Sequence, residues 1–486
     1  MADEKSYRQI VKTTGLFGGV EIVRILVGII QTKVVAVLLG PAGVGIQNLF
    51  NTALHMLTSF FGFGLQTSAV REIAQANGTG DGHVVSKTII TLRRWVSCTA
   101  VAGAVLMIVL ASQLSQWTFG TSKFSFEFVL LSLALIFTLI SNGQIALIKG
   151  LRRLKDLAKA SLLGSVLSLI VSVPLFYIYG EKAIVPVLII TALSLLCCSW
   201  FYARRIRMVK VTISYSESFQ KGKEMFKIGF FLMLSSFLMQ LASFLINSFI
   251  THNGTVDDVG YYRAGFLITA HYVGLIFTAM GADFLPRLSE VNADAEKMRT
   301  IVIQQTEVAA LIIAPMVSLL FPLSRFMINV LYSPDFYLIE PFICLAALGL
   351  VARAGVWCLS YLMLANGLSK DFFVSELFGN ATNVGLCIWG YHIWNISGLG
   401  IAFMLNNLLC LVFNYYLVWK HCKFTYGWGV LSKMLILNAV IVVMFLVYVI
   451  IHNIVVSIAI ALPFCWYCLN NLQVRMGINI FKRFKK

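Results

Sequence analysis

The chain has 486 residues, of which 59% are hydrophobic and 12% charged, and its mean hydropathy is +0.84. These values exclude a soluble globular domain and predict an all-α polytopic membrane protein. The formal net charge of +17 resembles that of nucleic-acid-binding proteins, but the basic residues cluster in short loops between apolar runs, so we expect no nucleic-acid partner.

The apolar runs predict where the chain crosses the membrane. A helix needs roughly 20 predominantly apolar residues to cross the hydrocarbon core, and runs of this kind predict about fourteen transmembrane helices. We expect them at residues 13–39, 44–67, 95–114, 126–148, 157–179, 184–203, 228–250, 264–285, 302–323, 338–364, 372–391, 396–418, 434–451 and 454–472. The loops of one side contain only Lys123, Lys182 and Arg263 as basic residues, whereas those of the other side are basic throughout. This asymmetry predicts cytoplasmic N- and C-termini.

The first predicted span contains ionisable residues in its middle. Glu21 and Arg24 lie one helical turn apart, so they share one face of the helix. A charged side chain at the bilayer centre costs about 2.5–3.5 kcal/mol on insertion scales, so this face is expected to contact other helices or water. Either the two residues form an ion pair that only fixes helix packing, or they line a substrate cavity. Intramembrane ionisable residues are functional by default, which favours the cavity.

Three later spans have polar faces, because their polar residues recur at helical spacing. The second span contains Asn48, Asn51 and His55, the seventh contains Gln240 and Asn247 with Ser236 and Ser243, and the eleventh contains Glu376 and Asn380. Small polar residues commonly form hydrogen bonds between membrane helices, and we assign Ser236 and Ser243 to that role. The other residues are candidates for lining a cavity.

Two further arginines extend the candidate set. Arg353 lies near the midpoint of the tenth span, and Arg263 begins the eighth span at its outer end. Snorkelling at the interface is the alternative explanation for a boundary residue such as Arg263. An arginine in a low-dielectric cavity can hold a phosphate through two parallel hydrogen bonds. Together with Arg24, these residues therefore indicate a cationic cavity and an anionic substrate.

The chain also contains a weak internal repeat. Val44-Gly45-Ile46 resembles Val259-Gly260-Tyr261, and Gly150-Leu151 with Lys155-Asp156 resembles Gly367-Leu368 with Lys370-Asp371, at nearly the same offset. The repeat predicts an N-terminal six-helix lobe at 1–210 and a C-terminal six-helix lobe at 211–422, in parallel orientation. Residues 423–486 would add two transmembrane helices and a basic cytoplasmic tail. Parallel repeats are typical of alternating-access transporters, with the substrate between the halves.

The sequence contains none of the motifs that would indicate catalysis. There is no GxxxxGK[ST] phosphate-binding loop, no HExxH or clustered His and Cys ligand set, and no paired carboxylates on an outer loop for glycosyl transfer. We therefore expect no enzymatic activity, no cofactor and no metal.

Four short motifs resemble segments of a known family. They are Leu39-Gly40-Pro41-Ala42-Gly43-Val44-Gly45, Ile148-Lys149-Gly150-Leu151-Arg152, Val259-Gly260-Tyr261-Tyr262-Arg263-Ala264 and Phe284-Leu285-Pro286-Arg287-Leu288-Ser289. In order and position they resemble the bacterial polysaccharide flippases, which are the Wzx-type O-antigen or enterobacterial-common-antigen translocases of the multidrug/oligosaccharidyl-lipid/polysaccharide (MOP) superfamily. The resemblance covers roughly residues 10–420. The final pair of spans resembles the peptidoglycan-precursor flippase branch instead.

The resemblance implies two six-helix lobes around a cationic central cavity. It implies transport of an undecaprenyl-pyrophosphate-linked oligosaccharide from the cytoplasmic to the periplasmic leaflet of the bacterial inner membrane, for O-antigen or surface-polysaccharide synthesis. Other polysaccharide assembly proteins are the expected partners, and the chain is expected to act as a monomer.

For a substrate of this kind, each candidate polar residue has an expected role. The pyrophosphate would be bound by Arg24, Arg353 and Arg263, and the sugar hydroxyls by Asn48, Asn51, His55, Gln240, Asn247 and Asn380. Glu21 would balance the charge of Arg24 when the cavity is empty. Glu21, Glu376 or His55 would couple transport to protons or sodium, if transport is coupled.

Two other functions compete with this interpretation. A cation-coupled multidrug exporter of the same superfamily would favour acidic residues and an apolar cavity, whereas the midplane charges here include Arg24 and Arg353. A membrane polymerase or ligase acting on lipid-linked glycans would need a large outer loop with catalytic residues. The longest well-defined outer loop, Thr251 to Arg263, is short.

Overall fold

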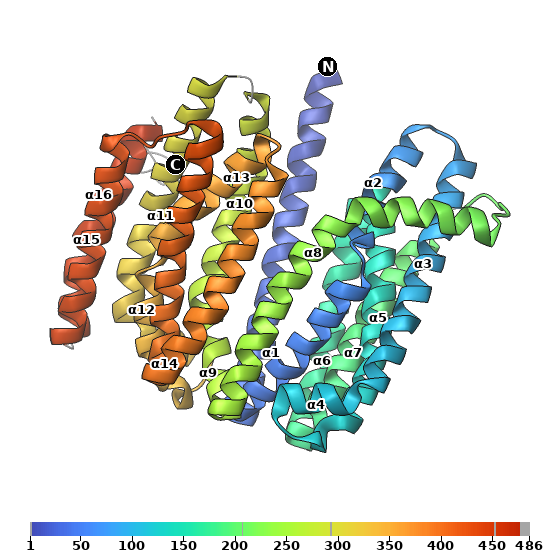
Figure 1. The fold of residues 1–486 in the computed structure, drawn as a ribbon, viewed down its shortest axis with the longest axis horizontal. Helices are drawn as coiled ribbons and strands as arrows, with labels where there is room; N and C mark the ends of the chain where they lie inside the picture. The colour runs from blue at the N-terminus through green and yellow to red at the C-terminus, as the bar shows by residue number, and fades with distance from the viewer. Residues whose placement is uncertain (1, 207, 292–293, 452, 477–486) are drawn as a thin grey trace. The chain divides into compact units, whose positions relative to one another are not determined.

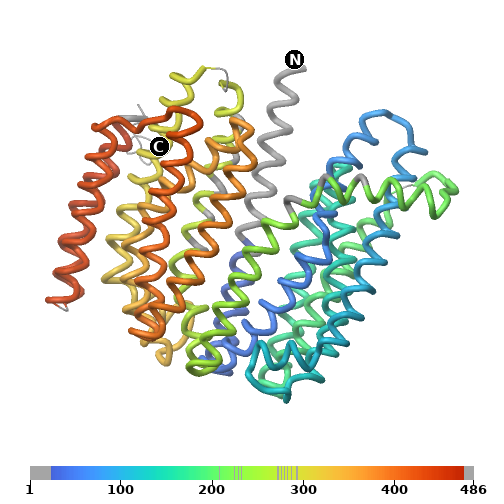
Figure 2. Tube along the Cα trace, in the orientation of Figure 1, coloured from blue at the N-terminus to red at the C-terminus, as the bar shows by residue number. Residues whose placement is uncertain are grey.

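The computed structural model describes residues 2–206, 208–291, 294–451 and 453–476; the side chains of 2–22, Arg24 and scattered other residues are outside the described part (Figure 2). Over these ranges the chain is helical and contains no strand, which confirms the all-α class. It folds into two compact units, Met1–Gly260 and Tyr261–Lys486. The expected division into 1–210, 211–422 and 423–486 follows the internal repeat rather than compactness, and it stays a prediction.

The helices have the length and composition of membrane spans. Within the described residues, nine helical stretches are long and apolar enough to cross a membrane, or up to ten if the bent pair Pro334–Ala347 and Leu350–Ala365 counts as one span. The stretches Leu154–Arg204 and Ser369–Cys422 each contain two of the predicted spans, and Ile25–Phe61 overlaps two more. The chain is therefore a multi-pass membrane protein, and its helices are consistent with about fourteen spans.

The N-terminal unit is a bundle of long helices (Figure 1). Its elements are α1 (Ala2–Phe61), α2 (Leu65–Gly78), α3 (Gly82–Val109), α4 (Ala111–Phe119), η1 (Ser122–Phe124), α5 (Ser125–Gly150), α6 (Leu154–Tyr179), η2 (Gly180–Ala183), α7 (Ile184–Arg204), α8 (Tyr215–Asn253) and the start of α9 (Val256–Phe266). The closest packing joins α5 to α7 and α3, and α6 to α7. Leu65, Ile89, Leu92 and Leu147 are central members of its apolar core.

Helices α1 and α8 pack against each other within this unit. α1 bends at Gly40, whose φ of 65° is accessible to glycine, and Pro41 follows it, so the bend lies between the first and second predicted spans, 13–39 and 44–67. α8 begins with a stretch that runs crosswise and then turns to lie beside α1 (Figure 1). The sequence predicts a loop over 204–227, whereas the structure begins a helix at Tyr215. We call residues 208–227 the basic elbow.

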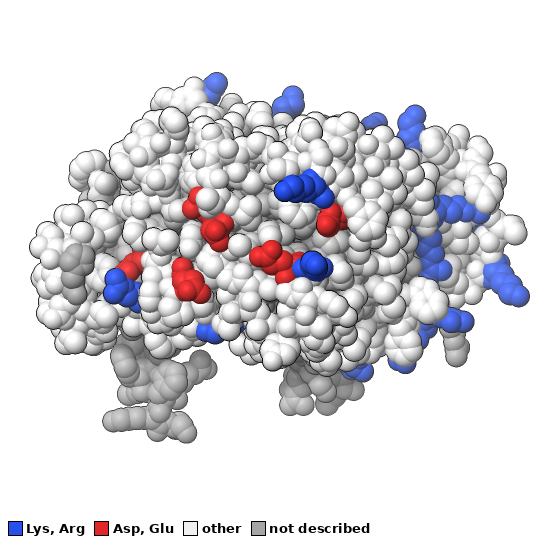
Figure 3. Space-filling model, turned by 90° about the horizontal axis from the view of Figure 1, so that it is seen from below, with Lys and Arg blue, Asp and Glu red and all other residues white. Residues whose placement is uncertain are grey.

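Charge differs between the two ends of the N-terminal unit. The basic elbow contains Lys210, Lys221, Lys223 and Lys227 against two acidic residues, Glu217 and Glu224. The connections at the other end contain Lys123 and Lys182, together with the acidic residues Glu127, Glu181, Asp257 and Asp258. Figure 3 views the whole molecule from this side and shows several Asp and Glu in the middle of the surface, with many of the Lys and Arg towards its edges. This is the charge asymmetry expected of a membrane protein whose basic end is cytoplasmic.

The C-terminal unit contains the remaining helices. They are the rest of α9, the π-helical turn η3 (Leu267–His271), α10 (Tyr272–Glu290), α11 (Ala295–Leu331), η4 (Pro334–Ile339), α12 (Glu340–Ala347), α13 (Leu350–Ala365), α14 (Ser369–Cys422), α15 (Trp428–Ile451) and α16 (Ile454–Met476). Asp294 caps α11, and the hydrogen bond from the Lys297 amide lowers the pKa of its carboxyl. α14 folds back at Trp394 and Asn395, where the backbone is not helical.

Polar contacts attach the last two helices to α11. Lys433 of α15 lies 3.3 Å from the carboxylate of Glu307, and Ser318 lies 3.5 Å from the Cys465 thiol of α16. Arg325 is paired with Glu340 at 2.7 Å, and the Tyr448 hydroxyl of α15 donates to the same carboxylate. The charge of Arg325, in a region where sequence patterns are ambiguous, is thereby neutralised.

Candidate functional site

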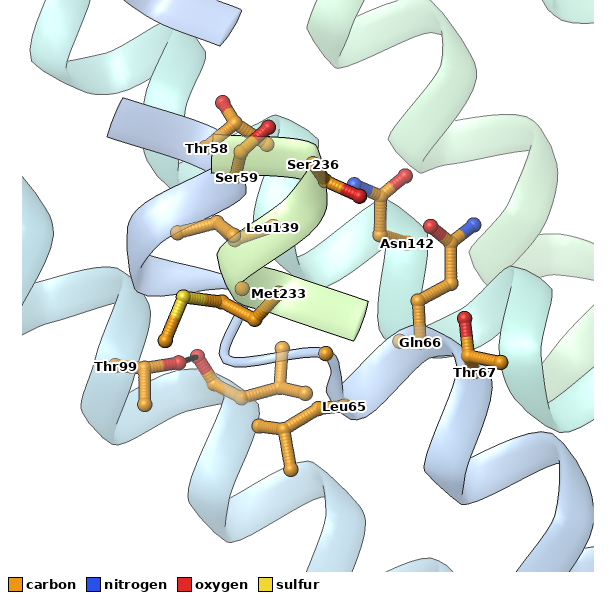
Figure 4. Close-up of a pocket in the computed structure, with 14 residues that line it drawn as sticks. Thr58, Ser59, Leu65, Gln66, Thr67, Thr99, Leu139, Asn142, Met233 and Ser236 are labelled. Carbon is orange, nitrogen blue, oxygen red and sulfur yellow. Dashed lines mark hydrogen bonds between the residues drawn. The ribbon is translucent and has the colours of Figure 1, made fainter. Parts of the chain in front are cut away.

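A polar cavity of about 190 Å³ lies in the N-terminal unit, where α1 ends and α2 begins. Polar side chains from α1, α2, α3, α5 and α8 line it: Thr58, Ser59, Gln66, Thr67, Thr99, Asn142 and Ser236. Figure 4 shows Gln66, Thr67, Asn142 and Ser236 gathered on one side. The cavity contains no charged lining residue, and its polar groups are hydroxyls and amides.

Most of these polar groups are available to a ligand. Thr58 donates to the Leu54 carbonyl at 2.7 Å and Thr99 to the Val96 carbonyl at 3.2 Å, so both hydroxyls are bonded to their own helices. The side chains of the remaining lining residues make no hydrogen bond to any described residue: Ser59, Gln66, Thr67, Asn142 and Ser236. Hydroxyl and amide groups of this kind both donate and accept, as sugar hydroxyls require.

The cavity exists because the backbone turns sharply between α1 and α2. Phe63 and Gly64 have φ values of 46° and 64°, so the helix cannot continue through them. Gly64 lies against Gly229 of α8, and a Cβ atom on Gly229 would lie 2.8 Å from the Phe63 carbonyl oxygen. This close backbone contact holds α8 beside the turn and positions Met233 and Ser236 at the cavity wall.

The polar faces predicted for the second and seventh spans, which lie on α1 and α8, reach this cavity. On α1, Ser59 lies one turn beyond His55, at the end of the face that contains Asn48 and Asn51. Asn48 is buried, Asn51 is half-buried and His55 is exposed. On α8, Gln240 is half-buried and lies one turn beyond Ser236. The sequence predicts a helix-packing role for Ser236, whereas the structure places it at the cavity wall.

Asn247 has a different environment from the other stripe residues. Its amide donates to the Thr52 hydroxyl of α1 at 3.3 Å, and the residue is 3% exposed. Its Oδ1 atom is buried without a hydrogen-bond partner among the described residues. In this structure Asn247 therefore connects α8 to α1, and its contact with a sugar stays a prediction.

In the C-terminal unit, Arg353 lies in the first turn of α13, after the 53° bend that follows α12. The sequence predicts one continuous tenth span there, and the structure shows it bent. The Arg353 guanidinium carbon lies 5.7 Å from the centre of the Phe403 ring of α14. Among the described residues no carboxylate pairs with it. An aromatic face stabilises the cation without using its hydrogen-bond donors, so the donors remain available for an anion.

The other predicted site residues of the C-terminal unit are Asn380, Glu376 and Arg263. Asn380 donates its amide to the Glu376 carbonyl at 2.9 Å, and Glu376 is half-buried without an ion pair in the described part of the chain. Arg263 is half-buried in the last turn of α9. A buried hydrogen bond from Ser375 to Asn414 at 2.5 Å joins the two arms of α14, and Asn414 donates to Ser360 of α13 at 3.2 Å.

Glu21 and Arg24, the two central charges of the first predicted span, belong to α1. Their side chains lie outside the described residues, so their ion pair and their place at a cavity stay predictions.

Sequence reasoning missed Gln66, Thr67 and Asn142. Asn142 was detectable, since it is an amide within the long apolar run 126–148. Gln66 and Thr67 follow the glycine-containing turn at the end of a span and look like ordinary boundary residues. Only the tertiary packing of α2 against α5 and α8 brings all three together.

Comparison with known proteins adds independent information. The sequence model of the family described as "Polysaccharide biosynthesis protein" matches residues 34–341. The "Lipid III flippase" of Escherichia coli (strain K12) is 21% identical over 408 residues, which cover 82% of this chain and 96% of that protein. The protein of the same name from Shigella flexneri matches to the same extent.

Solved structures share the fold. A "Lipid II flippase MurJ" in an inward closed conformation superposes with a TM-score of 0.73 at 14% identity, covering 96% of this chain and 99% of the other. An inward-facing multidrug resistance MATE family transporter of the MOP superfamily gives a TM-score of 0.69 at 16% identity, covering 82% and 94%. These likenesses show the MurJ- and MATE-like fold of the superfamily.

Proposed function

The chain belongs to the polysaccharide biosynthesis protein family, and on that basis we propose that it is a flippase for a lipid-linked oligosaccharide. Both curated relatives are flippases by name and match nearly their whole length. The proposed activity is transport across the bilayer, without a catalysed bond change.

The observation that supports this proposal most directly is the polar cavity. An uncharged chamber lined by unpaired hydroxyls and amides suits sugar hydroxyls, which exchange hydrogen bonds with water for equivalent ones in the protein. Its volume of about 190 Å³ is below the roughly 300–1,000 Å³ of a site that encloses a drug-sized ligand. The cavity therefore serves as a subsite for part of the glycan, with Asn48, Asn51, His55 and Gln240 extending it along α1 and α8.

The pyrophosphate is assigned to arginines. Arg353 has free donors and no counter-ion in the described surroundings, which is the environment in which a buried guanidinium binds phosphate strongly. Arg24 and Arg263 are the further candidates, with Glu21 as the group that balances Arg24 before the substrate arrives. Asn247 and Asn380 complete the proposed sugar ligands.

The proposal also includes the direction and the mechanism of transport. The substrate is proposed to be an undecaprenyl-pyrophosphate-linked oligosaccharide, moved from the cytoplasmic to the periplasmic leaflet of the inner membrane for surface-polysaccharide synthesis. Alternating access would expose the site to each side in turn. Glu21 and Glu376 are candidates for coupling this cycle to an ion gradient. The protein is proposed to act as a monomer beside other polysaccharide assembly proteins.

The multidrug exporter is the second candidate, and the likeness to MATE transporters favours it. One reconstitution experiment separates the two. Purified protein in liposomes should transfer a fluorescent undecaprenyl-pyrophosphate oligosaccharide between leaflets faster than protein-free liposomes, and should not accumulate ethidium under an imposed proton or sodium gradient. Ethidium accumulation without lipid transfer would make the exporter correct. Equal transfer with and without the gradient would remove the coupling proposal.

A further inference from the structure

A second cavity of about 560 Å³ lies between α3 and the first turns of α8, which belong to the basic elbow. Its lining includes Arg93 and Arg94, the aromatic residues Trp95, Tyr215 and Phe219, and Thr99, which also lines the polar cavity. The volume lies within the roughly 300–1,000 Å³ typical of ligand sites, which combine apolar walls with a few polar groups. The transport cycle described above makes no use of this cavity.

Contacts between α3 and the basic elbow hold the walls of the cavity together. The Trp95 ring stacks on Phe219 at 5.3 Å between centroids, and its indole donates to the Ser218 carbonyl at 3.1 Å. Lys87 lies 3.3 Å from Glu217. Despite these contacts, Tyr215 is 81% and Phe219 62% exposed, so the cavity mouth presents aromatic surface to its surroundings. Aromatic residues beside Lys and Arg are typical of the headgroup region of a bilayer.

The two arginines of the cavity differ in how many of their hydrogen-bond donors have partners. Arg94 donates to the carbonyls of Ile213 and Ser214 at 3.1 and 3.3 Å and lies 4.3 Å from the Tyr215 ring centre, so it is occupied. Among the described residues Arg93 makes one hydrogen bond, to the Met208 sulfur, a weak acceptor, at 3.6 Å, and its buried Nε has no partner. Within the same part of the chain Arg93 therefore has unused donors and no carboxylate partner.

We propose that this cavity binds one acidic phospholipid of the cytoplasmic leaflet, with the phosphodiester on Arg93 and an acyl chain along Trp95 and Phe219. The lysines of the basic elbow would attract anionic lipid to the cavity mouth, because the cytoplasmic leaflet has a negative surface potential. A single available cation matches the one negative charge of a phosphodiester better than the larger charge of a diphosphate. The bound lipid would hold the elbow against α3.

Two native cysteines provide the test. Cys98 lines the cavity, Cys197 lies on α7, and both are exposed. We expect phosphatidylglycerol, but not phosphatidylcholine, to slow the alkylation of Cys98 in the purified protein, measured by peptide mass spectrometry. Alkylation of Cys197 should be unchanged. Equal protection of Cys98 by both lipids, or by neither, would overturn the proposal.

Variants identify the binding groups. Arg93→Gln should raise the phosphatidylglycerol concentration for half-protection by about tenfold, because a hydrogen bond to a charged group is lost. Phe219→Ala, at an exposed position that tolerates change, should also raise it. Lys182→Gln removes an equal charge from an exposed position at the other end of the N-terminal unit and should leave it unchanged. Unaltered protection in both cavity variants contradicts the assignment. If undecaprenyl diphosphate protects Cys98 at lower concentration than phosphatidylglycerol, the occupant is the isoprenoid carrier and the phospholipid assignment is wrong.

Discussion

At the scale of single residues, Arg353 shows how a buried cation can be kept ready for an anion. Placing the guanidinium over the Phe403 ring stabilises the charge by roughly 0.5–2 kcal/mol. A carboxylate partner would have stabilised it too, but it would also have occupied the donors. The ring therefore leaves Arg353 able to bind a phosphate in its fork geometry.

Replacing the proposed phosphate ligands tests this assignment. Arg353→Ala and Arg24→Ala should each abolish or severely reduce glycan transfer in liposomes, and Arg→Lys at either position should retain part of the activity, because charge remains while bidentate geometry is lost. Lys297→Ala removes an exposed surface cation and should transfer normally. Normal transfer by both alanine variants, at normal expression, would show that the cationic cavity is not the binding site.

Asn142 permits a test of the sugar subsite. Asn142→Leu keeps the side-chain size but removes both hydrogen-bonding groups from the cavity, and one lost substrate hydrogen bond should slow transfer by about tenfold. Asn77→Leu changes an exposed asparagine away from the cavity and is the matched control. The rate of transfer of the fluorescent oligosaccharide is the measurement; similar rates for the two variants would exclude a role for the Asn142 amide.

At the scale of helices, the sequence patterns located the spans well and their interruptions less well. The bend of α1 was predictable, because Gly40-Pro41 disfavours a straight helix. The bend between α12 and α13 was not, since Leu348 and Gly349 keep α-region angles and no proline marks the position. The start of α8 was missed because it is rich in polar and charged residues, and it is stabilised by contacts with α3 rather than by an apolar run.

The contact of α8 with the turn between α1 and α2 gives a prediction at this scale. Gly229→Ala would place a Cβ atom 2.8 Å from the Phe63 carbonyl oxygen, so we expect it to lower the free energy of unfolding by about 1–3 kcal/mol. Gly28→Ala is the control, because its Cβ would meet nothing within 4 Å. Thermal melting in detergent measures both, and equal melting temperatures would show that α8 can shift without cost.

At the scale of the whole molecule, hydropathy and charge were enough to predict an all-α membrane protein. The cavity could not be predicted, because its lining residues come from five helices and only their packing brings Gln66, Asn142 and Ser236 together. The stripes that contain Asn48 and Gln240 were visible as periodicities, but a periodicity does not state which neighbour the polar face contacts.

The predicted topology can be tested in intact cells. Cysteines introduced as Lys123→Cys and Asp257→Cys should react with a membrane-impermeant maleimide added from the periplasmic side, because both are expected in outer loops. Lys210→Cys, in the basic elbow, should react only after the inner membrane is permeabilised. Peptide mass spectrometry distinguishes the new thiols from the native ones. The opposite pattern would reverse the orientation and with it the direction of transport.

Main-chain contacts join α1 and the turn after it to α8 and α9. At the turn Gly64 meets Gly229 of α8, and near the bend of α1 Gly45 lies against Val256 of α9 while Gly260 of α9 lies against Pro41. Interlocked side chains must be reordered each time two surfaces rejoin, at an entropic cost of up to about 2 kcal/mol for each long side chain. Smooth peptide surfaces avoid this cost. A helix interface of this kind can open and close repeatedly with little reordering of side chains. A transporter needs such an interface, whereas a protein with a fixed structure does not.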